Sequence, residues 1–131
     1  MFYEFNSNII FRDYSCGHAY ISCVACDLKK EKIYSSGINI YNSDLNTSFK
    51  NSIPQVIHAE ENAVHNLKAS EKLKPIDIIV FRTNKNASSY LMAKSCTNCK
   101  NVMNRTLKYK NWKPRNLLYT DENGILCKDA W

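Results

Sequence analysis

The chain has 131 residues, of which 44% are hydrophobic and 23% charged, with only three glycines and three prolines. This composition excludes a disordered chain, a collagen-like repeat and a long flexible linker, and the length suits a single domain with its own core. The formal charge of +6 favours partners that carry phosphate. The lysines are scattered, however, and a solvated basic surface is the simpler explanation for each cluster.

The start of the chain does not resemble a secretory signal, because Glu4 and Asn6 interrupt the apolar residues there. No apolar run approaches the roughly 20 residues that a membrane-spanning helix needs. We therefore expect a cytoplasmic protein with no membrane partner. In that reducing compartment the six cysteines are expected to act as metal ligands or packing residues, not as disulfides.

The first half of the chain predicts two strands and a long loop. Residues 20–27 are apolar almost throughout and predict a central strand, and residues 33–39 predict a second strand that forms a hairpin with it. Residues 1–15 have a loosely helical apolar spacing, which predicts a short amphipathic helix. Residues 40–56 are rich in Asn, Ser and Thr and predict a surface loop, long enough to suggest a functional role.

The second half predicts two helices and three further strands. Residues 58–72 have a helical apolar pattern that we expect to end before Pro75, and residues 96–109 have a second one. Residues 76–82 would be hydrophobic on both faces of a strand, which predicts a central position in the sheet. The remaining segments are a polar loop at 83–89, an extended segment at 90–92, a strand at 116–120, a turn at 121–124 and a short strand at 125–127.

Helices interspersed among hydrophobic strands predict an α/β fold, in the form of a three-layer α/β/α sandwich around a mixed five-stranded sheet. The hairpin-like turn at 121–124 predicts that the last two strands are antiparallel. The sequence shows no internal repeat and no second domain, so residues 1–131 are interpreted as one domain.

The main chemical signal is a histidine at position 58 followed by Glu60, combined with Cys96 and Cys99 further along. Each half alone is weak, because Cys-x-x-Cys pairs are commonly structural zinc or redox motifs. Together they supply three zinc ligands and one free carboxylate, and three protein ligands leave a coordination position open, as in catalytic zinc sites. Both ligand sets lie at predicted helix starts, where the helix dipole favours thiolate sulfur.

This combination is the signature of zinc-dependent nucleobase deaminases. Zinc lowers the pKa of a bound water to roughly 7, which provides a nucleophile at neutral pH. Glu60 would carry the proton of that water to the base and to the departing amine. Glu61 lies about 100° round the helix from Glu60 and is expected to face solvent.

A competing metal site uses the second Cys-x-x-Cys pair, Cys23 and Cys26, together with Cys96 and Cys99 as four thiolate ligands. Residues three apart on a strand point to opposite faces of the sheet. We therefore expect Cys23 and Cys26 to pack in the core. The sequence contains no His-Glu-x-x-His motif, which excludes the common zinc-protease arrangement.

With these motifs the sequence resembles the cytidine and deoxycytidylate deaminase superfamily, over most of its length. The segments that carry the resemblance are 32–39, which ends in Gly-x-Asn, 58–64 around the histidine, 95–99 around the cysteine pair, and 118–121 near the end.

The resemblance implies roles for three further residues. Asn39 would hydrogen-bond the sugar or the base edge of the substrate, although a turn residue at a strand end is an alternative reading. Ala59, through its backbone, would read the pyrimidine edge together with Glu60. Tyr119 would line the base pocket, although plain core packing explains it equally well.

The resemblance also implies an activity: zinc-dependent hydrolytic deamination of a cytosine nucleoside or nucleotide to the uracil product, with release of ammonia, by a homodimer or homotetramer. Ser95 departs from the family, which has a proline before the first cysteine. The long loop before His58 favours a substrate with a phosphate, whereas the final hairpin resembles enzymes that act on cytidine. The alternatives are deamination of a base in tRNA or single-stranded nucleic acid, and a catalytically idle zinc-stabilised binding protein.

Overall fold

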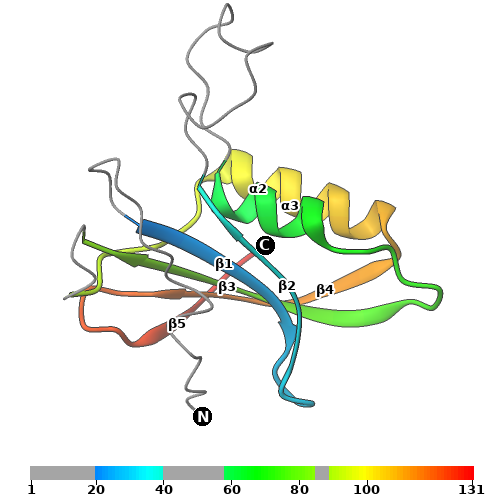
Figure 1. Ribbon diagram of the computed structural model, residues 1–131, viewed down its shortest axis with the longest axis horizontal. Coiled ribbons are helices and arrows are strands. Elements are labelled where there is room, and N and C mark those ends of the chain that lie inside the picture. The colour runs from blue at the N-terminus through cyan, green and yellow to red at the C-terminus, as the bar shows by residue number, and fades with distance from the viewer. Residues whose placement is uncertain (1–19, 40–57, 85–88) are drawn as a thin grey trace, which may run out of the picture.

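The computed structural model describes residues 20–39, 58–84 and 89–131. They form a mixed five-stranded sheet with the order β2-β1-β3-β4-β5 and two helices (Figure 1). The pair β3–β4 is parallel, and the pairs β1–β2, β1–β3 and β4–β5 are antiparallel. The elements are β1 (Tyr20–Asp27), β2 (Lys32–Ile38), α2 (Ala59–Asn66), β3 (Lys74–Thr83), α3 (Thr97–Tyr109), β4 (Trp112–Thr120) and β5 (Leu126–Asp129). The predicted α/β class is confirmed.

Both helices cover the same face of the sheet (Figure 1). Ala63 of α2 and Met103 of α3 belong to one buried cluster with Ile78 of the central strand. The described residues therefore form two layers. The third layer of the predicted sandwich is not among them. The helix expected in residues 1–15 lies outside the described residues, as does the loop at 40–56.

The side chains of the central strands alternate between the two faces of the sheet. Cys23 belongs to the cluster under the helices, whereas Cys26 packs with Ile79 and Phe81 on the opposite face. The prediction that Cys23 and Cys26 point apart is confirmed, and the five cysteines of the described ranges are free thiols. Burial, followed by the charge of nearby Asp77, raises the pKa of Cys26 to about 12.

Helix α2 is shorter than predicted, because it ends at Asn66 and not near residue 72. The last carbonyl groups of a helix have no partner within it. Here the Lys110 ammonium, just after α3, donates hydrogen bonds of 2.8, 2.8 and 2.6 Å to the carbonyl oxygens of Val64, His65 and Leu67. The end of α2 is therefore fixed by a side chain that is distant in sequence.

Two prolines lie in strands that begin earlier than predicted. Pro75 was expected to terminate a helix, but it lies in β3 opposite Lys113 of β4, and Pro114 lies opposite Ile76. Proline removes a hydrogen-bond donor from a sheet and is tolerated near strand starts and irregularities. The register of β3 and β4 shifts just after these residues, between Ile76 and Ile78. The expected extended segment at 90–92 makes only an isolated bridge, between Tyr90 and Thr83.

A buried acid ties the β1–β2 turn to β4. The carboxylate of Asp77, which is fully buried, accepts hydrogen bonds from Nε and Nη2 of Arg115 at 3.0 and 2.6 Å and from the backbone N–H of Leu28 at 2.9 Å. Burial tends to raise the pKa of Asp77, but the hydrogen bonds from Arg115 and Leu28 hold it below its usual range. This acid is fully engaged in structural contacts.

Gly37 lets α2 lie directly on β2. A Cβ atom at this position would lie 2.3 Å from the backbone N of Ala63 and 2.7 Å from the carbonyl oxygen of Ala59. Both atoms are backbone atoms of α2, so a side chain at position 37 would push the helix away from the sheet.

None of the helices in the described ranges is long and apolar enough to cross a membrane.

We predict that Gly37→Ala lowers the melting temperature by several degrees, because the added methyl group clashes with the α2 backbone. Overpacking of this kind typically costs about 1–3 kcal/mol. Thermal unfolding followed by circular dichroism measures the effect. Ser36→Ala, one residue earlier on the same strand, is the control and should leave the melting temperature almost unchanged. Equal melting temperatures for Gly37→Ala and the wild type would contradict the close approach.

Candidate metal centre

The three expected metal ligands come together at the N-terminal ends of the two helices. One ligand atom each from His58, Cys96 and Cys99 lies within 4.8 Å of the other two. Cys99 Sγ and His58 Nδ1 are 3.1 Å apart. His58 is the N-cap residue of α2 and Cys96 is the N-cap residue of α3. The predicted convergence of two helix starts is therefore confirmed.

The local conformation of α3 holds its two cysteines on one side of the helix start. Cys96 has an extended backbone, with φ of −72° and ψ of 164°, and its Sγ accepts a hydrogen bond from the backbone N–H of Cys99 at 3.4 Å. The first turn of α3 contains no acidic residue. No acidic side chain of the first turn therefore offsets the partial positive charge of the helix N-terminus beside the sulfur atoms.

The donor set fits a divalent metal ion. In the bare site, burial raises the pKa of Cys99 well above its ordinary value, and the negative charge of Glu60 and the contact with Cys96 raise it further. A bound cation reverses this preference, because coordinating thiols are deprotonated. Two sulfur atoms and one imidazole nitrogen are ligands that zinc prefers, and three of them leave one tetrahedral position open.

The candidate ligands line a cavity of about 190 Å³. Glu60 and Lys94, the residue before Ser95, line it as well. This volume is smaller than that of pockets for drug-sized ligands. The lining residues are Ile21, His58, Glu60, Val80, Arg82, Met92, Ala93, Lys94, Cys96 and Cys99. The cavity is thus bounded by the start of β1, the end of β3, the starts of both helices and the segment that precedes α3.

Glu60 is placed as the sequence predicted, beside the ligands but outside their group. It lies in the first turn of α2 and is only 5% exposed. The hydroxyl of Ser95, which is also buried, donates a hydrogen bond of 2.9 Å to Glu60 Oε2. A carboxylate buried in this way keeps a fixed position next to the candidate metal ligands. Glu61, expected to face solvent, is exposed.

The three residues expected to contact substrate do not line this cavity. Asn39 is buried, and its Oδ1 accepts a hydrogen bond from the backbone N–H of Ile21 at 3.2 Å, which extends the pairing of β2 with β1. Ala59 is fully buried in the core beneath α2. Tyr119 is half-buried against the same core, and burial, then the neighbouring Cys127, raises its pKa. Their substrate roles stay predictions.

Sequence reasoning missed three polar residues of the site. Arg82 and Lys94 line the cavity, and Ser95 holds Glu60. Arg82 could have been found, because even-numbered residues of β3 face the helices and the apolar series Ile76, Ile78 and Val80 continues to position 82. Ser95 carried no such signal.

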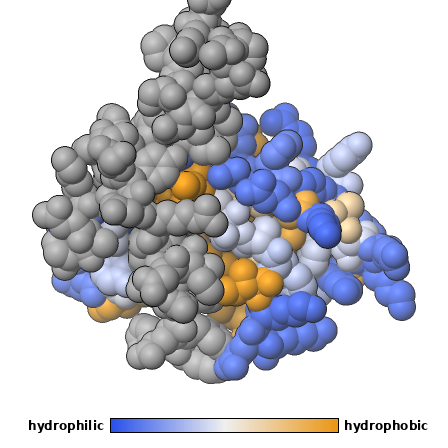
Figure 2. Space-filling model, in the orientation of Figure 1, coloured by the Kyte–Doolittle hydropathy of each residue, from blue (hydrophilic) through white to orange (hydrophobic). Residues whose placement is uncertain are grey.

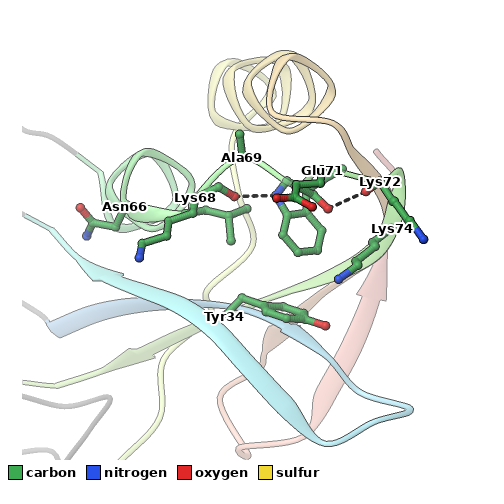
Figure 3. A pocket seen from close by; sticks show the side chains of 10 residues that line it. Tyr34, Asn66, Lys68, Ala69, Glu71, Lys72 and Lys74 are labelled. Atoms are coloured by element: carbon green, nitrogen blue, oxygen red, sulfur yellow. Dashed lines mark hydrogen bonds between the residues drawn. The ribbon is translucent and has the colours of Figure 1, made fainter.

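A larger cavity of about 680 Å³ lies at the opposite end of α2 (Figure 3). It is bounded by Tyr34 of β2, by the segment that follows the helix and by Trp112, whose ring centre is 4.9 Å from that of Tyr34. The indole N–H of Trp112 donates to the carbonyl oxygen of Lys68 at 2.9 Å. This cavity contains none of the candidate metal ligands.

Comparison of the chain with protein-family models, with curated proteins and with solved structures found no match. The structure brings His58, Cys96 and Cys99 together in a group that could hold a metal ion. The binding of a metal, its identity and the reaction are proposals.

We predict that Cys99→Ser weakens zinc binding more than about tenfold, because a serine hydroxyl is a poor ligand for this metal. Competition with a chromophoric chelator measures the affinity. Cys127→Ser is the matched control, since Cys127 lies on β5 outside the ligand group. Zinc binding by the wild type should also weaken as the pH falls, because protons then compete with zinc for the thiolate sulfur atoms. Equal zinc affinities for the two variants would contradict the site.

Proposed function

We propose that this protein catalyses zinc-dependent hydrolytic deamination of a cytosine nucleoside or nucleotide, giving the uracil product and ammonia. The observation that supports this most directly is the carboxylate of Glu60, buried in the same cavity as a ligand set with an open position. A purely structural metal site needs a fourth protein ligand, and the group of candidate ligands in the described residues has three.

His58, Cys96 and Cys99 would hold the zinc ion. Zinc bound there would supply a water molecule whose pKa is lowered to roughly 7, compared with 15.7 for bulk water. The rest of the chemistry is proton transfer, and it would fall to Glu60, which lines the same cavity as the ligands.

Glu60 would move two protons in sequence. It would first take a proton from the attacking water, as the water oxygen bonds to C4 of the cytosine ring, and deliver that proton to N3. It would then carry the second proton of the water to the amino group, so that the C4–N bond breaks and ammonia leaves while C4 becomes a carbonyl. General acid–base catalysis by one positioned group is typically worth about 10²–10⁴-fold in rate.

Ser95 would act on the reaction through Glu60 as a positioning residue. Its hydrogen bond to Oε2 restricts rotation of the carboxylate, so that the same group can meet the water and the ring in turn. Proline, which the resembled family has at this position, has no donor to offer. The departure from the family therefore supplies a contact to the catalytic acid.

One observation favours cytosine over a purine base. Strands β4 and β5 are joined by a short turn, as in the enzymes that act on cytidine, whereas the tRNA adenosine deaminases place a helix between the corresponding strands.

The same proposal includes a cytidine-deaminase-like, three-layer fold and a homodimer or homotetramer. Supporting the third layer, the face of the sheet opposite the helices carries the apolar residues Val24, Ile79 and Phe81. An apolar sheet face of this kind is normally covered by a second layer.

We predict that Glu60→Gln lowers kcat by at least about 10²-fold, because glutamine cannot accept and release the proton. Zinc content should stay equal to that of the wild type, since Glu60 is not in the ligand group. The assay incubates zinc-loaded protein with cytidine, deoxycytidine, CMP and dCMP and follows loss of the cytosine absorbance. Turnover of none of the four by the wild type, or wild-type turnover by the variant, would refute the proposed function.

We predict that Ser95→Ala lowers kcat about tenfold while KM changes little, because the carboxylate loses the contact that orients it. Ser95→Thr keeps the hydroxyl and should recover most of the activity. Zinc content, measured by atomic absorption on the same samples, serves as the control for damage to the neighbouring Cys96. If Ser95→Ala and Ser95→Thr lose activity to the same degree, the hydroxyl does not position Glu60.

A further inference from the structure

Two cations line the candidate metal cavity. They are Arg82, near the end of β3, and Lys94, in the segment that leads to α3. Glu60 is the acid among the lining residues of the described ranges, and the ionised cysteines would be offset by the metal they bind. The cavity lining therefore carries two positive side chains against the one carboxylate of Glu60.

Arg82 has an unused hydrogen-bond donor at this place. Its Nε is buried and has no hydrogen-bond partner, and its Nη1 donates only a long bond of 3.4 Å to the carbonyl oxygen of Met92. Of the buried side-chain polar atoms without a partner in the described ranges, Arg82 Nε is the one on a residue that lines the cavity. Buried donors without acceptors are uncommon in folded proteins, so an acceptor is expected to bind there.

The second arginine of the sheet shows what a satisfied guanidinium looks like here. Arg115 donates to Asp77 at 3.0 and 2.6 Å and to Asp27 at 2.9 Å. Neither Arg82 nor Lys94 belongs to an ion pair within the described ranges. Within the described ranges, Arg82 therefore has hydrogen-bond donors left for an anion, whereas Arg115 has carboxylate partners.

Lys94 acts electrostatically on an acidic residue of the protein, Asp129. Burial tends to raise the pKa of Asp129, but its contact with Lys100 lowers it and the charge of Lys94 adds to that lowering. Asp129 forms its ion pair with Lys100, at 2.9 Å. Lys94 is exposed and lies towards solvent, where it can attract an anion without binding it alone.

We propose that Arg82, assisted by Lys94, binds the phosphate group of the substrate, so that the substrate is a cytosine nucleoside monophosphate and not a free nucleoside. The proposal rests on the proposed function. The forked N–H groups of arginine match the oxygen atoms of a phosphate, which is why arginine is common where phosphate is recognised. The ring and the phosphate would then bind in one cavity, whose lining includes both the candidate metal ligands and the two cations.

The larger cavity does not offer the same evidence, although it also has basic residues around it. Lys68, Lys72 and Lys74 are exposed and Glu71 lies among them (Figure 3). None of the described residues lining that cavity has a buried side-chain donor without an acceptor. Lysines on a solvated surface account for its charge.

The proposal is tested with kcat/KM for dCMP and deoxycytidine, using zinc-loaded wild type, Arg82→Gln and Lys94→Gln. The wild type should prefer dCMP. Arg82→Gln should lose at least about tenfold for dCMP, chiefly through KM, and less than about threefold for deoxycytidine, because only the phosphate contact is removed. Lys94→Gln should show a smaller loss of the same kind. Lys108→Gln, on the exposed side of α3, is the matched charge control and should resemble the wild type.

Arg82→Lys covers the case in which Arg82→Gln fails to fold, since it keeps the charge but not the fork. It should fall between wild type and Arg82→Gln for dCMP. Equal kcat/KM of the wild type for dCMP and deoxycytidine would overturn the proposal. So would equal losses for both substrates in the folded Arg82 variants, because Arg82 would then act on the base or on the fold.

Binding of inorganic phosphate separates this proposal from the proposed function. At constant ionic strength, phosphate should raise the melting temperature of zinc-loaded wild type and of Glu60→Gln, and the shift should be reduced in Arg82→Lys and lost in Arg82→Gln. If no cytosine compound is turned over but this pattern holds, the deaminase proposal fails and the anion site stands. If deoxycytidine and dCMP are turned over but phosphate gives no Arg82-dependent shift, the anion site fails alone.

Discussion

The candidate site depends on one constraint, which is that α2 and α3 begin at the same end of the sheet and lie close to it and to each other. At the start of the helices, Cys99 Sγ lies 3.1 Å from His58 Nδ1. At the far end, the Lys110 ammonium after α3 binds the terminal carbonyl groups of α2. Gly37 sets the height of α2 above β2, because any side chain there would meet the helix backbone. The ligand geometry is therefore fixed by contacts at both ends of the helix pair.

Two buried acids, Asp77 and Glu60, differ in the hydrogen-bond partners of their carboxylates. Asp77 accepts from Arg115, Asn116 and the backbone of Leu28, so it is held as an ion by structural partners. Glu60 accepts a hydrogen bond from the Ser95 hydroxyl, interacts with the Cys99 thiol and lines a cavity. A fully paired carboxylate is suited to joining strands, whereas a carboxylate that lines a cavity can also meet a bound molecule. The difference between them follows from their partners and not from burial, which both share.

The sequence was sufficient wherever local pattern decides the structure. The apolar run at β3 predicted a central strand, and the period of two predicted that Cys23 and Cys26 diverge. The motifs at two predicted helix starts predicted that His58, Cys96 and Cys99 come together. It was insufficient where a distant residue decides. The early end of α2 depends on Lys110, and the place of Pro75 in β3 depends on pairing with β4. The same limit hid the contact between Ser95 and Glu60, which are 35 residues apart.

The positive charge of the chain and the charge of the cavity are separate matters. The formal charge of +6 arises mainly from lysines on the solvated surface, and hydrophilic residues dominate the described part of the visible face (Figure 2). Exposed charges of this kind are screened by salt and attract many anions weakly. Arg82 is half-buried, has an unused donor and faces a cavity that also contains the candidate metal ligands. A half-buried arginine such as Arg82 could hold a phosphate at one defined place in the cavity. Net charge cannot do this, because exposed charges do not fix the position of an anion.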